Sequence, residues 1–303
     1  MSMEPKAASN QPSISSPAVQ TVIQARQRPM EDLVVRQALP AAERCTIGPF
    51  VFFDHVGPNH FSPGSGLSVR PHPHIGLATL TYLYEGVIRH RDSLGFRQDI
   101  KPGAVNWMTA GRGIVHSERS PEERTETSHT LMGLQVWVAL PQEAEQMAPS
   151  FVHFSAPSLP DKQQPGVTIK VIAGRCFGLT SPLVTQSPLF FVDIRLDAGA
   201  STTLEIDYPE RAIYIVQGEL SLSGNTYHEG QMLILQPDAE AKVTSHSEAV
   251  FVVVGGEPLA EPRYLWWNFV ASDKKLIEQA KRDWQAGQLG HIPGDKESTP
   301  LPT

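Results

Sequence analysis

The sequence predicts an all-β protein built from two similar barrels, with one helix near its C-terminus. Glycine and proline are abundant, at 23 and 26 among 303 residues, which favours short strands joined by tight turns. Apolar and β-branched residues recur in short runs with period-two patterns, which is typical of strands in a sandwich or barrel. The runs lie at 77–84, 131–140, 167–173, 189–196, 212–217, 232–235 and 249–254, and each is bounded by Gly, Pro, Asn, Asp or Ser.

One segment departs from this alternation and predicts a helix. Ser272 can cap it, and the apolar residues that follow, as far as Trp284, recur at helical spacing. A shorter helix can begin at Pro141, after a strand, and end at the pair 149–150, which would mark the boundary between two halves. We therefore expect helices to be a minor part of the fold.

An internal repeat indicates that the two halves share one β-barrel unit. In each half a tyrosine is followed by a glycine and, after a hairpin, by a second glycine that leads into an apolar strand. The first half has the longer hairpin, with an added loop around 91–95. The matching positions are Tyr82, Gly86 and Gly103 in the first half and Tyr214, Gly218 and Gly230 in the second.

The composition excludes several classes of function. The formal net charge of −7 disfavours direct binding of nucleic acid. The sequence contains no run of roughly 18 consecutive apolar residues, the length that a membrane span requires. The two cysteines, Cys45 and Cys176, cannot form a disulfide framework or a multi-cysteine zinc site. Residues 1–20 lack the apolar core of a secretion signal, so we expect a disordered leader on a cytoplasmic protein.

Histidines concentrate in the first half, where seven of the eleven lie within 55–129. Two patterns carry chemical information: one residue separates His72 from His74, and one residue separates His116 from Glu118. Residues i and i+2 of a strand point to the same face, so each pair can send two ligands into one cavity. A single pair of this kind is more often a surface feature, but two pairs within one repeat favour a metal site.

Three imidazoles and one carboxylate suit a divalent ion such as Fe(II), Mn(II), Ni(II) or Zn(II). In a six-coordinate shell they leave two positions for water, O2 or a substrate oxygen, which favours redox or Lewis-acid chemistry over a closed structural site. The repeat provides an internal comparison. Counted from the matching glycines, the second half has Leu204, Ile206, Val243 and Ser245 at these positions, so we expect it to be a packed barrel without metal ligands.

At these residues the sequence resembles the pirin family of bicupins. The resemblance is dense over 54–141 and extends, mainly in architecture, over nearly everything after the leader. It implies two cupin barrels, the first of which holds a single non-haem iron through His72, His74, His116 and Glu118. The segments that carry the resemblance are 70–86, 90–95, 102–103, 107–118, 133–141 and 171–174.

The resemblance also implies an activity. Some pirin-like proteins resemble quercetin 2,3-dioxygenases, which open a flavonol ring with O2, so we expect a flavonol or another small aromatic substrate. Glu118 is the expected catalytic proton acceptor. Fe(II) is the expected cofactor, with Mn, Ni, Co, Cu or Zn as alternatives.

The sequence is also compatible with two other functions. One is a redox-sensing iron protein that regulates a protein partner, either a transcription factor or a metabolic enzyme. The other is a non-redox metal-dependent cupin enzyme, which needs only Lewis-acid chemistry. Many relatives have Glu where this chain has Ala78, a difference that we expect to act on the surroundings of the ligands.

Six further residues are candidates for the pocket or for contacts with the ligands. Trp137 could also form part of the pocket wall. Aromatic residues on strands, however, belong more often to a hydrophobic core than to a ligand pocket. The candidates are His55, His60 and His90 near the cavity entrance, Trp107 and Met108 as pocket walls, and Gln135 as a polar contact.

These observations predict three parts of the chain. They are a disordered leader at 1–20, a metal-binding cupin barrel at 21–148, and a second cupin barrel at 149–303 that carries the helix and a tail. The tail from Gly290 is polar and rich in proline, and we expect a coil that is either free or strapped onto the body.

Overall fold

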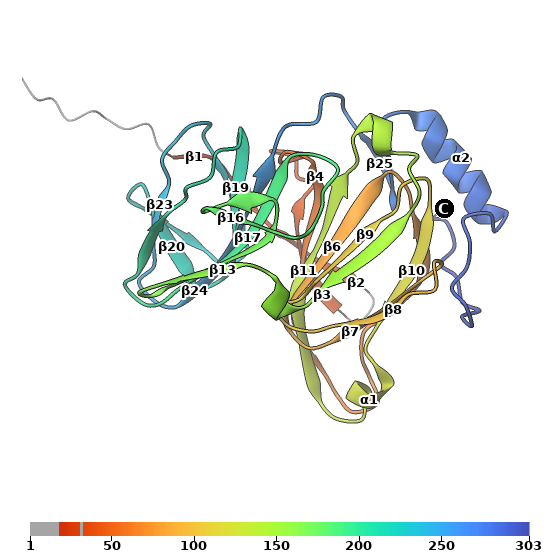
Figure 1. Cartoon of the computed structure of the whole chain (residues 1–303). Coiled ribbons are helices and arrows are strands. Elements are labelled where there is room, and N and C mark those ends of the chain that lie inside the picture. Colours follow the sequence, from red (N-terminus) through yellow and green to blue (C-terminus); the bar gives the residue numbers. More distant parts are fainter. Residues whose placement is uncertain (1–17, 31–32, 303) are drawn as a thin grey trace, which may run out of the picture.

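The computed structural model describes residues 18–30 and 33–302, and in it two barrels of antiparallel strands lie side by side (Figure 1). This confirms the all-β architecture of two cupin barrels with a C-terminal helix. All seven runs that the sequence analysis singled out are strands.

The first barrel consists of a seven-stranded and a four-stranded sheet. In spatial order, the larger sheet contains β12 (Ser150–Phe154), β9 (Val105–Thr109), β6 (Leu77–Glu85), β11 (His129–Ala139), β4 (Phe50–Phe61), β3 (Leu33–Leu39) and β2 (Arg26–Met30). The smaller sheet contains β5 (Ser68–His74), β10 (Ile114–Arg119), β7 (Ile88–Asp92) and β8 (Arg97–Ile100).

The second barrel repeats this division. In spatial order, its larger sheet contains β1 (Val19–Gln24), β22 (Gln231–Leu235), β19 (Glu210–Gln217), β24 (Ala249–Gly256), β17 (Leu189–Leu196), β14 (Val167–Ala173) and β13 (Asp161–Gln164). Its smaller sheet contains β18 (Ser201–Thr203), β23 (Lys242–Thr244), β20 (Glu219–Leu222) and β21 (Asn225–His228).

Strand pairing crosses the division that the sequence suggested. β1 pairs with β22 of the second barrel, although the expected boundaries assign most of β1 to the first barrel. β12 pairs with β9 of the first barrel, although it follows the expected boundary at 148–149. Of the expected leader, residues 1–17 lie outside the described residues, whereas Val19 already belongs to β1. Each half therefore completes the larger sheet of the other.

One hydrophobic core joins the two larger sheets. In β17, Leu189 and Phe191 belong to this core, whereas Phe190 and Val192 fill the interior of the second barrel. The ring centroids of Phe191 and Tyr82 of the first barrel lie 6.4 Å apart. Because alternate residues of a strand face opposite sides, one run of apolar residues serves both the barrel interior and the contact between barrels.

The interior of the second barrel is filled by side chains. Leu204, Ile206 and Val243, which the repeat aligns with metal-ligand positions of the first half, are buried in its core. Ser245 is fully buried and its hydroxyl donates to the carbonyl of Glu219 at 3.1 Å. These four positions therefore contribute to packing.

The chain after the second barrel returns to the first one (Figure 1). β25 (Tyr264–Trp266) and β26 (Phe269–Ala271) form a hairpin, and α2 (Lys274–Gln285) follows it. Phe269 forms a parallel bridge with Ile75 at the end of β5, and the Thr299 amide donates to the Pro71 carbonyl at 2.8 Å. The tail is therefore strapped onto the first barrel.

The start of α2 corrects one detail of the sequence analysis. Its N-cap is Asp273, whose side chain accepts from the Lys275 amide at 2.9 Å. Ser272 binds Glu145 instead. The shorter helix expected from Pro141 is a single 3₁₀ turn, η1 (Gln142–Ala144). The remaining elements are α1 (Glu122–Thr125), η2 (Ala156–Ser158), β15 (Arg175–Cys176) and β16 (Leu179–Thr180).

Across residues 18–30 and 33–302, no helix has both the length and the apolar character needed to cross a membrane.

Glu145 attaches the returning segment to the first barrel. Its carboxylate accepts from the Ser272 amide at 2.7 Å and hydroxyl at 2.8 Å, and lies 3.0 Å from Arg263 Nε. The side chains of Arg263 and Glu145 are only 4% and 1% exposed, so removing either partner leaves an uncompensated buried charge.

We expect Glu145→Ala to lower the free energy of unfolding by roughly 3–5 kcal/mol, measured by denaturant titration. Glu143→Ala, at an exposed position on the same turn, is the control and should change it by less than about 0.5 kcal/mol. Equal stability of the two variants would contradict this role of Glu145.

Candidate metal centre

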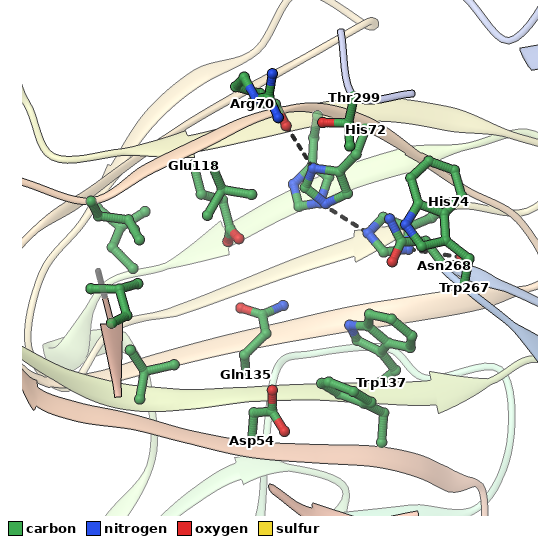
Figure 2. Close-up of a pocket in the computed structure, with 17 residues that line it drawn as sticks. Asp54, Arg70, His72, His74, Glu118, Gln135, Trp137, Trp267, Asn268 and Thr299 are labelled. Carbon is green, nitrogen blue, oxygen red and sulfur yellow. Dashed lines mark hydrogen bonds between the residues drawn. The ribbon is translucent and has the colours of Figure 1, made fainter. Parts of the chain in front are cut away.

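The first barrel contains a cavity of about 410 Å³ between its two sheets. One wall comes from β5 and β10 and carries the histidines, and the other comes from β4 and β11 (Figure 2). Most of the remaining lining is apolar and includes Leu67 and Ile88. The histidines therefore lie in a chamber whose lining is largely apolar.

Three histidines meet on the first wall. His72 and His74 come from β5 and His116 from β10, and one nitrogen of each lies within 4.8 Å of the others. The Nε2 atoms of His74 and His116 are 3.1 Å apart. All three side chains are buried.

Strand pairing brings these residues together. In the antiparallel pair of β5 and β10, His116 lies directly opposite His72. The register then shifts, because Glu118 pairs with Val69 and β5 contains one extra residue, a β-bulge that includes Arg70 and Pro71. Proline has no N–H to donate to a ladder, so a bulge is one of the few places in a sheet that accepts it.

Hydrogen bonds on the outer nitrogens orient the first two imidazoles. His72 Nδ1 donates to the Arg70 carbonyl at 2.8 Å, and His74 Nδ1 donates to the Asn268 carbonyl at 3.1 Å. A neutral imidazole that donates through Nδ1 has its lone pair on Nε2. Both lone pairs therefore face the cluster.

A relay of polar groups orients the third imidazole. His116 Nδ1 lies 3.4 Å from His90 Nδ1, and His90 Nε2 lies 3.0 Å from a carboxylate oxygen of Asp92. Because Asp92 accepts from His90 Nε2, His90 Nδ1 is an acceptor and His116 Nδ1 is the donor. The His90 ring also stacks on Phe151 with centroids 4.3 Å apart. This arrangement directs the third lone pair inward.

Burial keeps the three imidazoles neutral. It lowers the pKa of His72 to about 4, and it lowers the pKa values of His74 and His116 well below the ordinary value. The neighbouring imidazoles lower the pKa values of His74 and His116 further, since each disfavours a second positive charge nearby. Neutral imidazole is the form that binds a metal ion.

The donor set fits a divalent cation. For metal–nitrogen bonds of about 2.1 Å, neighbouring ligands of an octahedral ion are about 3.0 Å apart. The 3.1 Å separation of the His74 and His116 nitrogens matches that value. His72, His74 and His116 can therefore hold a metal ion on one face and leave the cavity side open to other ligands.

Glu118 lies in the same cavity but apart from the histidine cluster. It lines the chamber, yet it is not part of the group whose ligand atoms lie within 4.8 Å of one another. Its Oε1 accepts from the Thr81 hydroxyl at 3.3 Å. Burial raises the pKa of Glu118, so this carboxylate is a stronger proton acceptor than an exposed one.

Among the other candidates, Gln135 lines the cavity and its Oε1 accepts from Thr81 at 2.9 Å. His90 contacts His116 from behind and does not line the cavity. Trp137, which the sequence analysis considered as a wall, does line it and stacks on Phe52 with centroids 4.1 Å apart.

Four of the candidates do not line the cavity. His55 is buried between the barrels, with Nδ1 3.2 Å from the Tyr214 hydroxyl. His60 is exposed and pairs with Thr130 at 3.0 Å. The other two are packing residues: Trp107 belongs to the core between the barrels, and Met108 packs in a small cluster with Ala110, Ile114 and Phe151.

Ala78 also lies away from the site. It is fully buried in the core between the barrels and pairs with Val138 on β11. Ala78 therefore contributes to packing between the barrels, rather than to the surroundings of the ligands.

Several residues that line the cavity were not predicted from the sequence. Trp267, Asn268 and Thr299 come from the returning C-terminal segment, and no local pattern connects them to the histidines. Asp54 is the exception, because it is the one charged residue within the largely apolar stretch 50–56, and this is a detectable signal.

Asp54 is a buried carboxyl group on the wall that faces the histidines. It is 9% exposed, and its Oδ1 has no hydrogen-bond partner among the described residues. Burial raises its pKa to about 7, although the side chain of Gln37 and the charge of Arg28 act in the opposite direction. No other described residue that lines the cavity forms a hydrogen bond with Oδ1 of Asp54.

Comparisons with known proteins agree with this geometry. The sequence profile of the Pirin family matches residues 32–138, and that of the Pirin C-terminal cupin domain matches 191–290. A Pirin-like protein of Caulobacter vibrioides is 44% identical over 89% of this chain and 94% of its own length. Pirin of Mus musculus is 31% identical over 84% and 88%. The crystal structure of a quercetin 2,3-dioxygenase from Acinetobacter baumannii superposes with a TM-score of 0.87 at 33% identity, covering 93% of this chain and 95% of that chain.

The pKa of Asp54 generates a prediction about stability. Between its ordinary pKa of 3.8 and about 7, folded Asp54 keeps a proton that the unfolded chain has released. The contribution of this group to the free energy of unfolding therefore falls as the pH rises through that window. Asp54→Asn should stabilise the chelator-treated protein more at pH 8 than at pH 5, by a difference on the order of 2 kcal/mol.

Denaturant titrations at the two pH values measure this difference. The exposed residue Asp161 provides the control, since Asp161→Asn should have the same small effect at both. A pH-independent effect of Asp54→Asn would show that the carboxyl is ionised at the same pH in the folded and unfolded states.

Proposed function

The chain belongs to the pirin family, and from this premise we propose that it is a dioxygenase of the quercetin 2,3-dioxygenase type that opens a flavonol ring with O2. The observation that carries the proposal is the chamber of the first barrel. Three neutral imidazoles and a carboxylate with a raised pKa face the same cavity of about 410 Å³. The likeness to the quercetin 2,3-dioxygenase structure supports a flavonol as the substrate.

We assign Fe(II) as the cofactor, held by His72, His74 and His116, and we propose Glu118, which lines the same cavity, as a fourth ligand once the ion is bound. When bound, such an ion supplies Lewis-acid and redox chemistry, polarising substrate oxygens and allowing electron transfer to O2. The hydrogen bonds on the outer nitrogens keep the three imidazoles in the orientation that this role requires.

Glu118 is the proposed proton acceptor. A flavonol must lose the proton of its 3-hydroxyl before the ring can be attacked, and a carboxylate with a raised pKa takes that proton more readily. The single hydroxyl proton of Thr81 lies between Glu118 and Gln135, at 3.3 and 2.9 Å. Thr81 can therefore turn toward Gln135 when Glu118 becomes protonated.

The walls of the chamber suit a planar aromatic substrate. Phe52 and Trp137 line the cavity and stack on each other with an angle of 17° between their rings. Trp267, from the returning segment, adds a second aromatic side chain to the lining. These aromatic side chains provide apolar contact area for such a ring.

We further propose that the two halves, expected at 21–148 and 149–303, have different roles. The first barrel carries out catalysis, and the second stabilises the structure of the first. The packed interior of the second barrel supports this assignment. We also propose that the protein lies in the reducing cytoplasm. Both cysteines of the chain, Cys45 and Cys176, are free, which supports this location.

Removal of one imidazole tests the ligand set. His74→Ala should reduce the metal content of purified, Fe(II)-loaded protein well below one ion per chain, measured by elemental analysis, because it deletes one of three neutral donors. His60→Ala removes an exposed histidine and should leave the content unchanged. Unchanged stoichiometry in the His74 variant would mean that the ligands are wrong.

Turnover tests the activity itself. After anaerobic Fe(II) loading, addition of a flavonol and O2 should consume the visible absorbance of the flavonol and release carbon monoxide. Glu118→Gln should lower kcat by about a hundredfold or more, since it removes the proton acceptor. Absence of turnover with any divalent metal would defeat the dioxygenase proposal.

A further inference from the structure

A buried carboxyl group in the cavity has one oxygen without a hydrogen-bond partner. Asp54 is 9% exposed, and its Oδ1 has no hydrogen-bond partner among residues 18–30 and 33–302. The side chain of Gln37 and the charge of Arg28 act on this carboxyl, but they leave Oδ1 without a partner. A buried oxygen without a hydrogen bond destabilises the fold, so it requires an explanation in a folded protein. Its neighbours on the same strand face, Phe52 and Val56, are apolar.

The position of Asp54 separates it from the metal centre. It lies on β4, directly opposite Gln135 on β11, whereas the histidines lie on β5 and β10. Packed sheets are about 10 Å apart, so a group on one wall and a metal on the other can contact opposite ends of one molecule. Figure 2 shows the imidazoles on one side of the chamber and Gln135, Trp137 and Asp54 on the other.

An aromatic pair lies beside Asp54 on the same wall. Phe52 and Trp137 line the cavity and stack on each other, and the His74 ring meets Trp137 edge-on with centroids 5.1 Å apart. An aromatic ring of a ligand can pack beside this pair with its edge substituents toward Asp54. Gln135, whose Oε1 accepts from Thr81, lies across from Asp54 and presents the donating end of its amide as a second polar contact.

We propose that Asp54 determines substrate specificity by binding a hydroxyl group on the aromatic ring farthest from the oxygens that the histidine centre holds. This inference rests on the proposed function and adds to it the substrate class: flavonols that are hydroxylated on the ring remote from the 3-hydroxyl and 4-carbonyl. The carboxylate accepts from such a hydroxyl, and the protonated acid donates to it, so either form provides a partner.

The experiment measures binding in place of turnover. Fe(II)-loaded protein under argon is titrated with two series of flavonols, one that differs only in the hydroxyls of the B ring and one that differs only at the 7-hydroxyl. Quenching of the tryptophans that line the cavity, Trp137 and Trp267, reports the dissociation constants. Asp54→Ala and Asp54→Asn are compared with Val56→Ala, which enlarges the same wall without removing a polar group.

In the unmodified chain, deletion of one remote hydroxyl should weaken binding roughly tenfold or more, as expected for a hydrogen bond to a charged group. In Asp54→Ala the same deletion should change the dissociation constant by less than about twofold, whereas Val56→Ala keeps the preference. Asp54→Asn retains an acceptor oxygen and should show an intermediate preference, which keeps the test valid if the alanine variant fails to fold.

The other outcomes are distinguishable. A hydroxyl preference that persists in both Asp54 variants, or that is absent from the unmodified chain in both series, overturns the role of Asp54 while the proposed function stands. If no flavonol binds the unmodified chain, the proposed function fails, and the inference fails with it.

Discussion

Each of the three buried imidazoles at the centre of this protein donates through its outer nitrogen to a fixed acceptor, and the site depends on this constraint. The acceptors are the Arg70 carbonyl, the Asn268 carbonyl and His90. They come from a β-bulge, from a hairpin almost two hundred residues away in the chain, and from a neighbouring strand. With these bonds in place, burial keeps the rings neutral and their lone pairs converge on one point. Without them, each ring could rotate and the cluster would be three unrelated side chains.

A chamber of this kind weakens a barrel, and the architecture offsets the loss. Polar groups occupy part of the interior of the first barrel, so that part contributes little hydrophobic stabilisation. The large core between the two seven-stranded sheets and the filled interior of the second barrel supply it instead. The exchange of β1 and β12 adds backbone hydrogen bonds across the boundary between the halves. These cores support the proposed role of the second barrel as a scaffold for the first.

The returning C-terminal segment connects the scaffold to the chemistry. Glu145 attaches its hairpin to the end of the first barrel, Asn268 orients His74, and Trp267 and Thr299 complete the lining of the cavity. On the opposite wall, Asp54 and Gln135 provide polar contacts at the far end of the same chamber. In the proposed function, metal binding and substrate recognition lie on different sheets of one barrel.

The sequence by itself determined the strands, the duplication and the close grouping of His72, His74 and His116, since strand alternation and the repeat are local patterns that follow from backbone geometry. It also indicated that the second half is packed, because Leu204, Ile206 and Val243 are apolar. Only the tertiary structure decided which buried histidine lies behind the cluster, that Glu118 lies apart from it, and that Asp54, Trp267 and Thr299 line the cavity. It also placed Trp107 and Met108 in the cores. The reason is physical: a strand pattern tells which residues share a face, whereas the partner of that face depends on pairings between segments far apart in the chain.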